Sequence, residues 1–263
     1  MRVVSIGSSS SGNSYIIQAG LKNLLLDVGL SATKIIGALS QCGIDPEAVD
    51  AVLLTHEHID HVRSVRAIAR KCPNADFYAS RGTVAGCENI RYIPAERLEI
   101  LRRGDIIEFG DVRVRCYGLS HDANEPLGYS VFADGEQLTV VTDTGIVTDE
   151  IFNEMRAADI LLIEANHEEN ILMYGDYPYS VKMRILSDHG HLSNVTAGEI
   201  LARMLEHRGD RVPDIMLAHL SEKNNTPYQA RLTVESVLKE HGYVRDENYH
   251  LCIAAKEGLT EPR

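Results

Sequence analysis

One short segment in the first half of the chain combines metal-ligating side chains at close spacing. Residues 55–61 read Thr-His-Glu-His-Ile-Asp-His and directly follow an apolar run. In an extended chain, residues i and i+2 face the same side, so His56 and His58 can converge on one ion. A turn into a helix from Asp60 would direct Asp60 and His61 to a neighbouring point. The segment therefore predicts two adjacent metal ions rather than a chance polar turn.

A site for two ions needs more ligands than this segment offers. Asp143 lies at the end of another apolar run, and the two oxygens of a carboxylate can bridge two ions. His121 and His219 also lie where apolar runs end. Taken alone, each of these histidines is more often a structural residue than a ligand. The segment already found favours the ligand interpretation.

Short runs rich in Val, Ile and Leu predict the strands that must position these residues, because each has the length of a strand and is bounded by Gly, Asn or Asp. The predicted strands are 3–6, 15–18, 24–27, 51–55, 112–117, 138–142, 160–164 and 215–220. Helical spacing predicts helices at 31–43, 60–71, 196–205 and 230–241, the third with a capping box from Thr196 to Glu199. This mixture predicts layered sheets flanked by helices in one domain, residues 1–263.

The composition is that of a soluble globular protein. The 263 residues include 26 Lys and Arg against 38 Asp and Glu, which gives a formal net charge of −12. This acidic total argues against coating of nucleic acid or anionic membranes by charge alone, although it allows a local basic groove. No apolar run reaches the ~18 residues of a membrane span, and the first residues turn polar too early for a signal peptide. The cysteines form no C-x-x-C pair, which favours a reducing cytoplasm.

The order of the candidate residues resembles the metallo-β-lactamase fold superfamily over nearly the whole chain. Asp27 comes first, then the segment 55–61, and then His121, Asp143 and His219. The resemblance implies an α/β fold, an αββα sandwich with the metals at one edge. It implies one metal site of His56, His58, His121 and Asp143, and a second of Asp60, His61, Asp143 and His219. Asp27 would orient the cluster without binding metal.

Differences from other branches of the superfamily indicate which branch this chain resembles. β-Lactamases have Cys or His where Asp143 stands, and flavodiiron oxygen reductases have Glu where His58 stands. Asp143 and His219 lie too close in sequence for a β-CASP insert. What remains resembles the bacterial WalJ/YycJ family of compact metal-dependent nucleases, through the segments 7–14, 120–129, 164–167, 190–194 and 219–225. That family implies 5′-to-3′ exonuclease activity on DNA ends, a role in repair and repair-protein partners.

Polar loops near the predicted ligands are candidates for contacts with a phosphate. The loop at 7–14 could present N–H groups and hydroxyls to an anion, or could be an ordinary flexible turn. His191 follows Gly190 just before a predicted helix, and it either contacts a phosphate or protonates the leaving group. Lys182 and Arg184 either add positive charge or lie on a solvated helix face. The candidate phosphate contacts are Ser10, Ser11, Asn13, Ser193, Ser221 and Asn224. The remaining histidines match no ligand position, and we expect them to be surface or structural residues: His167, His189, His207, His241 and His250.

These observations lead to the hypothesis of a binuclear-metal phosphodiesterase. Two divalent ions, Zn²⁺, Mn²⁺ or Fe²⁺, would lower the pKa of a shared water, and the bridging hydroxide would attack phosphorus in line. Asp60 and His191 are the expected catalytic residues. The alternative is a hydrolase of a cyclic phosphodiester, thioester or lactone on the same site, which a closed apolar pocket would favour. A non-catalytic scaffold is disfavoured because all seven expected ligands are present.

Overall fold

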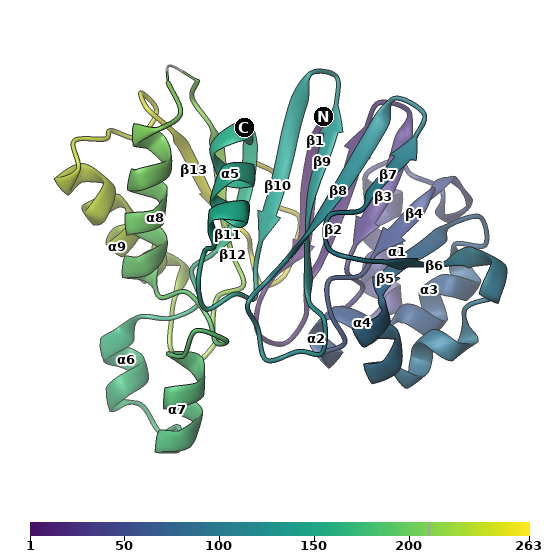
Figure 1. Cartoon of the computed structure of the whole chain (residues 1–263), viewed down its shortest axis with the longest axis horizontal. Coiled ribbons are helices and arrows are strands. Elements are labelled where there is room, and N and C mark those ends of the chain that lie inside the picture. Colours follow the sequence, from purple (N-terminus) through teal and green to yellow (C-terminus); the bar gives the residue numbers. More distant parts are fainter. Residues whose placement is uncertain (210) are drawn as a thin grey trace. The chain divides into compact units, whose positions relative to one another are not determined.

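The computed structural model describes residues 1–209 and 211–263, which form two compact units (Figure 1). Unit 1 comprises Met1–Gly118, Ala123–Gly135 and Ala255–Glu261. Unit 2 comprises Leu119–Asp122, Glu136–Ala254 and Pro262–Arg263. Strands flanked by helices are present in each unit, as expected from the sequence, whereas one domain over residues 1–263 stays a prediction.

Six strands of unit 1 form a mixed sheet in sequence order. They are β1 (Arg2–Gly7), β2 (Ser14–Ala19), β3 (Lys22–Leu26), β4 (Ala51–Leu53), β5 (Asp76–Ser80) and β6 (Leu98–Leu101). The first three are antiparallel, and β3 to β6 are parallel. Leu26 pairs with Leu53, so the residues that follow β3 and β4 emerge at the same edge of the sheet. This edge receives Asp27 and the segment 55–61.

Helices α1 (Ala32–Gln41) and α3 (Val65–Lys71) pack on one face of this sheet through apolar side chains. Ile35, Val52 and Phe77 are completely buried in this core. The single helix predicted at 60–71 is wrong, because α2 (Ile59–Val62) and α3 are separate. Between them the hydroxyl of Ser64 donates to the carbonyl of Leu30 at 2.6 Å, and its N–H donates to the carbonyl of Val28 at 3.0 Å. These bonds hold the chain to the loop after β3 and interrupt the helix.

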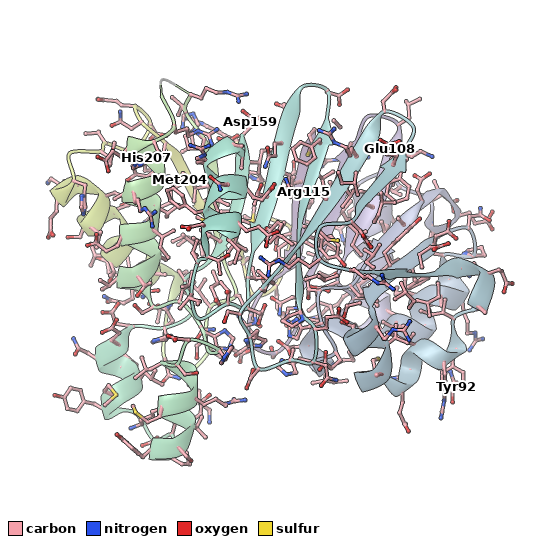
Figure 2. The ribbon with its side chains drawn as sticks, viewed as in Figure 1. Tyr92, Glu108, Arg115, Asp159, Met204 and His207 are labelled. Carbon is pink, nitrogen blue, oxygen red and sulfur yellow. The ribbon has the colours of Figure 1, made fainter. Side chains whose placement is uncertain are left out.

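Three further strands of unit 1 pair antiparallel in sequence order: β7 (Ile106–Phe109), β8 (Val112–Gly118) and β9 (Leu127–Ala133). β9 contacts β2. The hydroxyl of Tyr129 donates to the carbonyl of Leu54 at 2.8 Å, which fixes the end of β4. The short elements of the unit are α4 (Arg81–Gly86) and 3₁₀ turns at Pro46–Ala48, Glu88–Tyr92 and Ala95–Arg97. Tyr92 projects from the surface (Figure 2).

Unit 2 contains four parallel strands, β10 (Glu136–Val141), β11 (Ile160–Glu164), β12 (Asp214–Ala218) and β13 (His250–Ile253). Its helices are α5 (Asp149–Ala157), α6 (Glu169–Tyr174), α7 (Tyr179–Ile185), α8 (Asn194–Glu206) and α9 (Pro227–Glu240). α8 contacts both α5 and α9, as Figure 1 shows. Parallel strands leave the sheet in one direction, so the residues after β10, β11 and β12 also meet at one edge.

The start of α8 differs from the sequence prediction. The cap is Ser193, whose hydroxyl accepts a hydrogen bond from the N–H of Thr196 at 3.1 Å, so the predicted capping box from Thr196 to Glu199 is wrong. At the other end of α8, Met204 is buried and His207 is exposed (Figure 2). Among the helices of residues 1–209 and 211–263, none combines the length and the apolar character of a membrane span.

Candidate metal centre

The predicted ligands of unit 1 lie between β4 and α3. His58 is the residue from which α2 begins, so Asp60 and His61 belong to that single helical turn. The ring centroids of His56 and His58 are 4.6 Å apart, and those of His56 and His61 are 4.1 Å apart. A carboxylate oxygen of Asp60 lies 3.3 Å from Nε2 of His61. The structure thus brings these four side chains together, and their role as ligands stays a prediction.

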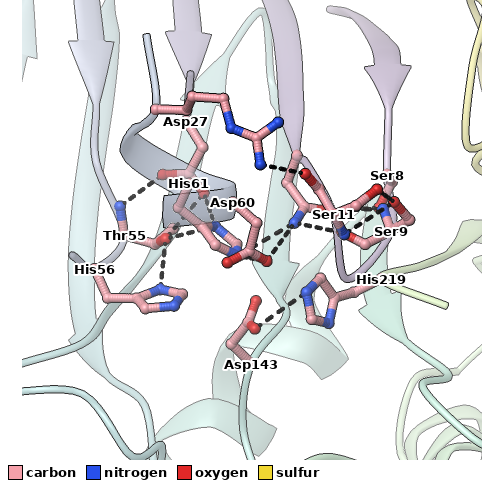
Figure 3. Close-up of polar contacts among 12 residues, drawn as sticks. Ser8, Ser9, Ser11, Asp27, Thr55, His56, Asp60, His61, Asp143 and His219 are labelled. Atoms are coloured by element: carbon pink, nitrogen blue, oxygen red, sulfur yellow. Dashed lines mark hydrogen bonds and ion pairs between the residues drawn. The ribbon is translucent and has the colours of Figure 1, made fainter. Parts of the chain in front are cut away.

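Asp27 anchors this group from the end of β3. One oxygen of its carboxylate accepts the N–H of Thr55 at 2.9 Å, and the other accepts the hydroxyl of Thr55 at 2.9 Å and Nδ1–H of His61 at 2.7 Å (Figure 3). All three residues are buried. A proton held on Nδ1 leaves Nε2 of His61 with the lone pair that a metal requires. These contacts support the orienting role expected for Asp27.

The loop at 7–14 packs directly against α2. The N–H of Asn13 donates to the carbonyl of Asp60 at 2.8 Å, and its amide nitrogen lies 3.3 Å from the carboxylate of Asp60 and 3.2 Å from Nε2 of His61. The amide of Asn13 is therefore directed at the candidate ligands. Ser10 and Ser11 are exposed on the same loop, where a phosphate can reach them.

Three further predicted ligands come together in unit 2. Asp143 follows β10, His219 follows β12, and His121 lies in the segment Leu119–Asp122. One oxygen of Asp143 is 3.3 Å from Nε2 of His219 and 3.8 Å from Nε2 of His121. Figure 3 shows Asp143 and His219 facing each other. All three side chains are buried, and burial lowers the pKa of His121, which keeps its ring neutral and able to bind a metal.

Glu164, at the end of β11, is a functional candidate for which no role was predicted from the sequence. Its carboxylate is completely buried and accepts hydrogen bonds from the N–H groups of Thr144 at 2.9 Å and Leu192 at 3.2 Å. The same carboxylate lies 3.0 Å from Nδ1 of His191 and 3.5 Å from Nδ1 of His219. Burial opposes its ionisation, but the two histidines outweigh burial and hold the pKa of Glu164 well below its usual range. The signal in the sequence that could have indicated Glu164 is a carboxylate at the end of an otherwise apolar strand.

The imidazoles share a pattern that fits a metal centre. In four of the predicted ligands, Nδ1 faces an oxygen of the protein, which leaves Nε2 for a ligand. The oxygens belong to Asp27 for His61, to Glu164 for His219, to the Gly190 carbonyl at 3.2 Å for His121 and to the Thr55 hydroxyl at 3.0 Å for His56. Metal-binding histidines in proteins are held in this way. In unit 2, ligand atoms of His121, Asp143 and His191 lie within 4.8 Å of one another. This set of buried nitrogen and carboxylate donors can therefore hold divalent metal.

The predicted phosphate contacts of unit 2 already have partners within the unit. Besides capping α8, the hydroxyl of Ser193 donates to Glu169 at 2.8 Å. The hydroxyl of Ser221 accepts the N–H of Asn224 at 3.2 Å. His191 is part-buried beside Glu164. Contacts of these residues with a phosphate stay predictions.

The histidines outside the predicted ligand set divide into two groups. His189, His207 and His241 are exposed, in agreement with a surface role, and His250 is half-buried. His167, in contrast, is 1% exposed, and within the described part of the chain its two ring nitrogens have no hydrogen-bond partner. Burial lowers the pKa of His167 to about 4, so the ring is neutral at pH 7.

The two basic residues upstream of His191 bind within unit 2. Lys182 donates to the carbonyl of Met173 at 2.8 Å and to that of Gly175 at 2.7 Å, which links α7 to α6. Arg184 forms an ion pair of 2.7 Å with Asp122. Lys182 therefore has a structural role, and Arg184 is held next to the segment that carries His121.

Known proteins are similar to this chain in sequence and in fold. Residues 22–209 match the family model described as a β-lactamase superfamily domain. Exodeoxyribonuclease WalJ of Streptococcus pneumoniae is 40% identical over 238 residues, which cover 89% of this chain and 87% of that protein. Exodeoxyribonuclease YycJ of Bacillus anthracis is 36% identical over 247 residues, 94% of this chain and 92% of that protein. The chain belongs to the WalJ/YycJ family of the metallo-β-lactamase superfamily.

The fold of this WalJ/YycJ family member is also found in a solved structure of low sequence identity. The metallo-β-lactamase fold protein YhfI of Bacillus subtilis superposes with a TM-score of 0.72 at 18% identity, over 99% of this chain and 98% of that one. The predicted fold class is thereby confirmed. Within the described part of unit 2, the chain between Asp143 and His219 forms α5, β11, α6 to α8 and β12, without a β-CASP insert.

Proposed function

We propose that this protein is a binuclear-metal phosphodiesterase that degrades DNA from its ends in the 5′-to-3′ direction. The observation that carries the proposal is the identity of 40% and 36%, over about nine tenths of the chain, to two proteins named exodeoxyribonucleases. The anchored imidazoles of both units support a metal-dependent reaction. DNA ends are the proposed substrate, and repair-protein partners and a cytoplasmic location belong to the same proposal.

The seven ligands of the proposed centre follow the pattern of the family. His56, His58, His121 and Asp143 would hold one ion, and Asp60, His61, Asp143 and His219 would hold the other. Zn²⁺, Mn²⁺ and Fe²⁺ all suit these nitrogen and oxygen donors. When bound, such ions polarise the phosphate and lower the pKa of water.

The protein's own residues supply orientation and proton transfer. Asp27 and Glu164 fix the rings of His61 and His219. Glu164 remains ionised, and its carboxylate lies 3.0 Å from Nδ1 of His191, which orients the His191 ring. His191 would then stabilise developing charge or donate a proton to the leaving 3′ oxygen.

The test uses purified protein with end-labelled single- and double-stranded DNA, RNA and bis-p-nitrophenyl phosphate, each with Mn²⁺ or Zn²⁺. We expect DNA to be cleaved, with a 5′ label released first as a mononucleotide. Asp60→Ala should lower kcat by at least about 10³-fold, because a ligand and the proton path are both lost. Asp111→Ala, an exposed residue in the turn between β7 and β8, is the matched control and should be active.

The same assay separates the proposal from its rivals. Cleavage of only the small ester would favour the small-molecule hydrolase and overturn the DNA assignment. Early release of a 3′ label would reverse the proposed polarity. Near-normal nuclease activity of Asp60→Ala protein would contradict the assignment of the centre.

A further inference from the structure

Unit 1 contains a basic cavity that the proposed reaction does not use. The cavity has a volume of about 280 Å³ and lies between the loop at 7–14, the start of α1 and the C-terminal segment of the unit. Three cationic side chains line it, Lys34, Arg63 and Lys256, together with one carboxylate, Glu257. The charge of these lining side chains is therefore +2 in a chain whose net charge is −12. Such a concentration of positive charge favours an anion.

Hydroxyl groups line the same cavity. Ser9 is 3% exposed, and its hydroxyl lies 3.0 Å from that of Ser11. Arg63 donates to the carbonyl of Ser11 at 3.0 Å, so its guanidinium is fixed at the wall of the cavity. Figure 3 shows Ser9 and Ser11 together on their loop. Hydroxyls and a held guanidinium are the groups with which proteins contact phosphate oxygens.

The C-terminal segment builds the opposite wall. The carbonyl of Ala255 accepts the N–H of Ser8 at 3.0 Å, and Thr260 pairs with Ser5 through hydrogen bonds of 2.8 and 3.0 Å. These bonds place Lys256 and Glu257 at the cavity, where Glu257 pairs with Lys34 at 2.7 Å. Residues from both ends of the chain are thus brought together around one basic space.

This cavity adjoins the candidate metal centre of unit 1. Arg63 directly follows α2, the turn that carries Asp60 and His61. The loop that supplies Ser9 and Ser11 also supplies Asn13, which binds Asp60. A strand whose scissile phosphate lies at Asp60 would therefore have another of its phosphates within reach of the cavity.

Resting on the proposed function, we propose that this cavity is a second phosphate-binding subsite, which holds a non-scissile phosphate of the DNA strand. A neighbouring cavity of about 360 Å³ shares Leu30, Lys34, Lys256 and Glu257 as lining and adds the apolar side chains of Ile6 and Leu259. It offers space for the nucleoside attached to the bound phosphate. The subsite lets the enzyme bind one DNA strand locally through positive charge, although the net charge of the chain is negative.

The test compares two double variants that each remove two positive charges. Lys34→Gln/Lys256→Gln changes the cavity, and Arg70→Gln/Lys71→Gln changes exposed residues at the end of α3 as the matched control. With metal-loaded enzyme, the cavity variant should raise the KM for a single-stranded oligonucleotide about tenfold, and that for bis-p-nitrophenyl phosphate less than twofold, since the small ester spans only the scissile position. The control should have wild-type values for both substrates.

A salt titration gives a second readout that loss of folding cannot imitate. Binding of a hydrolysis-resistant phosphorothioate oligonucleotide to metal-loaded protein should depend less steeply on salt in the cavity variant. The slope of log K against log[salt] should fall by about 0.7, the value for one phosphate of a single strand. An unchanged slope, an equal rise of KM for the small ester or the same effect in the control would overturn the subsite.

The outcomes for subsite and function remain distinguishable. If wild-type protein cleaves DNA and the cavity variant does so with an unchanged KM, the subsite fails and the function stands. If wild-type protein binds the oligonucleotide through the cavity but cleaves no DNA, the function fails and the subsite stands. Inorganic phosphate that binds the cavity as tightly as the oligonucleotide would identify a site for the free ion and overturn the DNA-strand assignment.

Discussion

At the scale of single residues, the candidate centre depends on residues whose backbone is held in a rarely adopted conformation. Asp27, Asp143 and His219 have φ values of 54°, 60° and 53°, in the left-handed region that non-glycine residues rarely adopt. Asp27 and His219 directly follow β3 and β12, Asp143 lies two residues after the end of β10, and all three are buried. Such strain persists where the surroundings hold the residue in place, and it is concentrated at functional sites. Three strained residues at three strand ends therefore support the location of the centre.

Asp27→Asn tests the anchoring of His61. The amide keeps the size of the side chain but cannot accept hydrogen bonds at both of its ends, so Nδ1–H of His61 loses its acceptor or Thr55 loses one. We expect metal affinity to fall about 10- to 100-fold, as for other residues that orient metal ligands. Titration with Zn²⁺ against a chromogenic chelator measures this. Asp111→Asn is the control, and an unchanged affinity of Asp27→Asn would contradict the anchoring role.

His167 predicts a pH dependence of stability. Its pKa falls from 6.5 to about 4 on burial, so the unfolded chain binds the proton more readily and stability is lost as pH falls from about 6.5 towards 4. His167→Leu removes this titration and leaves no polar atom unpaired. Between pH 7.5 and pH 5, the free energy of unfolding of the wild type should fall by about 2 kcal/mol more than that of the variant.

Urea unfolding of both proteins at the two pH values measures this difference. His207→Leu, a change at an exposed histidine, is the control and should follow the wild type. If the free energies of unfolding of wild type and His167→Leu stay parallel from pH 7.5 to pH 5, the buried neutral state assigned to His167 is wrong.

At the scale of elements, the position of α2 depends on close contacts with a neighbouring loop. A Cβ atom at Gly29 would overlap the carbonyl oxygen of Asp60, so the loop after β3 can approach α2 this closely only with glycine. The N–H of Val28 donates to the carbonyl of His61 at 2.8 Å in the same contact. A single helical turn has little stability of its own. Its position is therefore set by the loops that touch it.

Gly29→Ala should displace α2 and with it Asp60 and His61. We expect a loss of at least about 2 kcal/mol in the free energy of unfolding, in the range of overpacked buried sites, together with weaker metal binding. Gly37→Ala on α1 is the matched control, since a Cβ there meets nothing within 4 Å and alanine favours a helix by up to about 1 kcal/mol. Urea unfolding measures both changes, and equal stability of the two variants would contradict this account.

The sequence analysis did not predict β5, β6, β7, β9 and β13, and three of these strands show a physical reason. β6 and β7 are short and largely exposed, so their composition carries little of the apolar signal of a buried strand. β9 is almost entirely buried, but its Gly128 and Ser130 interrupt the pattern. Gly128 allows the ring of Tyr117 on β8 to pack against the backbone, a contact that no local pattern indicates.

At the scale of the whole molecule, metal binding should be linked to stability. A ligand that binds only the folded protein adds about 2.7 kcal/mol when its concentration is 100 times its Kd. We expect Mn²⁺ or Zn²⁺ to raise the Tm of chelator-treated protein, and Asp143→Asn to lose most of this rise because the shared carboxylate is missing. Differential scanning fluorimetry measures both. A full rise in Asp143→Asn, or none in the wild type, would contradict the proposed centre.

Net charge was a weaker guide than the distribution of charge. The total of −12 argues only against coating of nucleic acid by charge alone. Two divalent ions would add four positive charges at the proposed reaction site, and the cavity near Arg63 concentrates more on the same unit. The acidic total fits an enzyme that engages DNA ends and does not coat long duplexes.

The sequence by itself determined the kinds and order of the candidate ligands. The spacing at 55–61, and the positions of Asp143 and His219 after apolar runs, reflect local backbone geometry that a strand imposes on its own residues. The resemblance carried by the longer motifs then indicated the family, which the comparisons confirmed.

Only the tertiary structure decided which atoms anchor these ligands. The bond from Asp27 to His61, the role of Glu164, the break before α3 and the cavity that joins Ser9 to Lys256 all connect residues far apart in the chain. Such contacts depend on the order of the strands in a sheet and on how the helices pack against it. A hydrogen bond between distant segments leaves no periodic pattern in either of them, so their sequences alone do not reveal it.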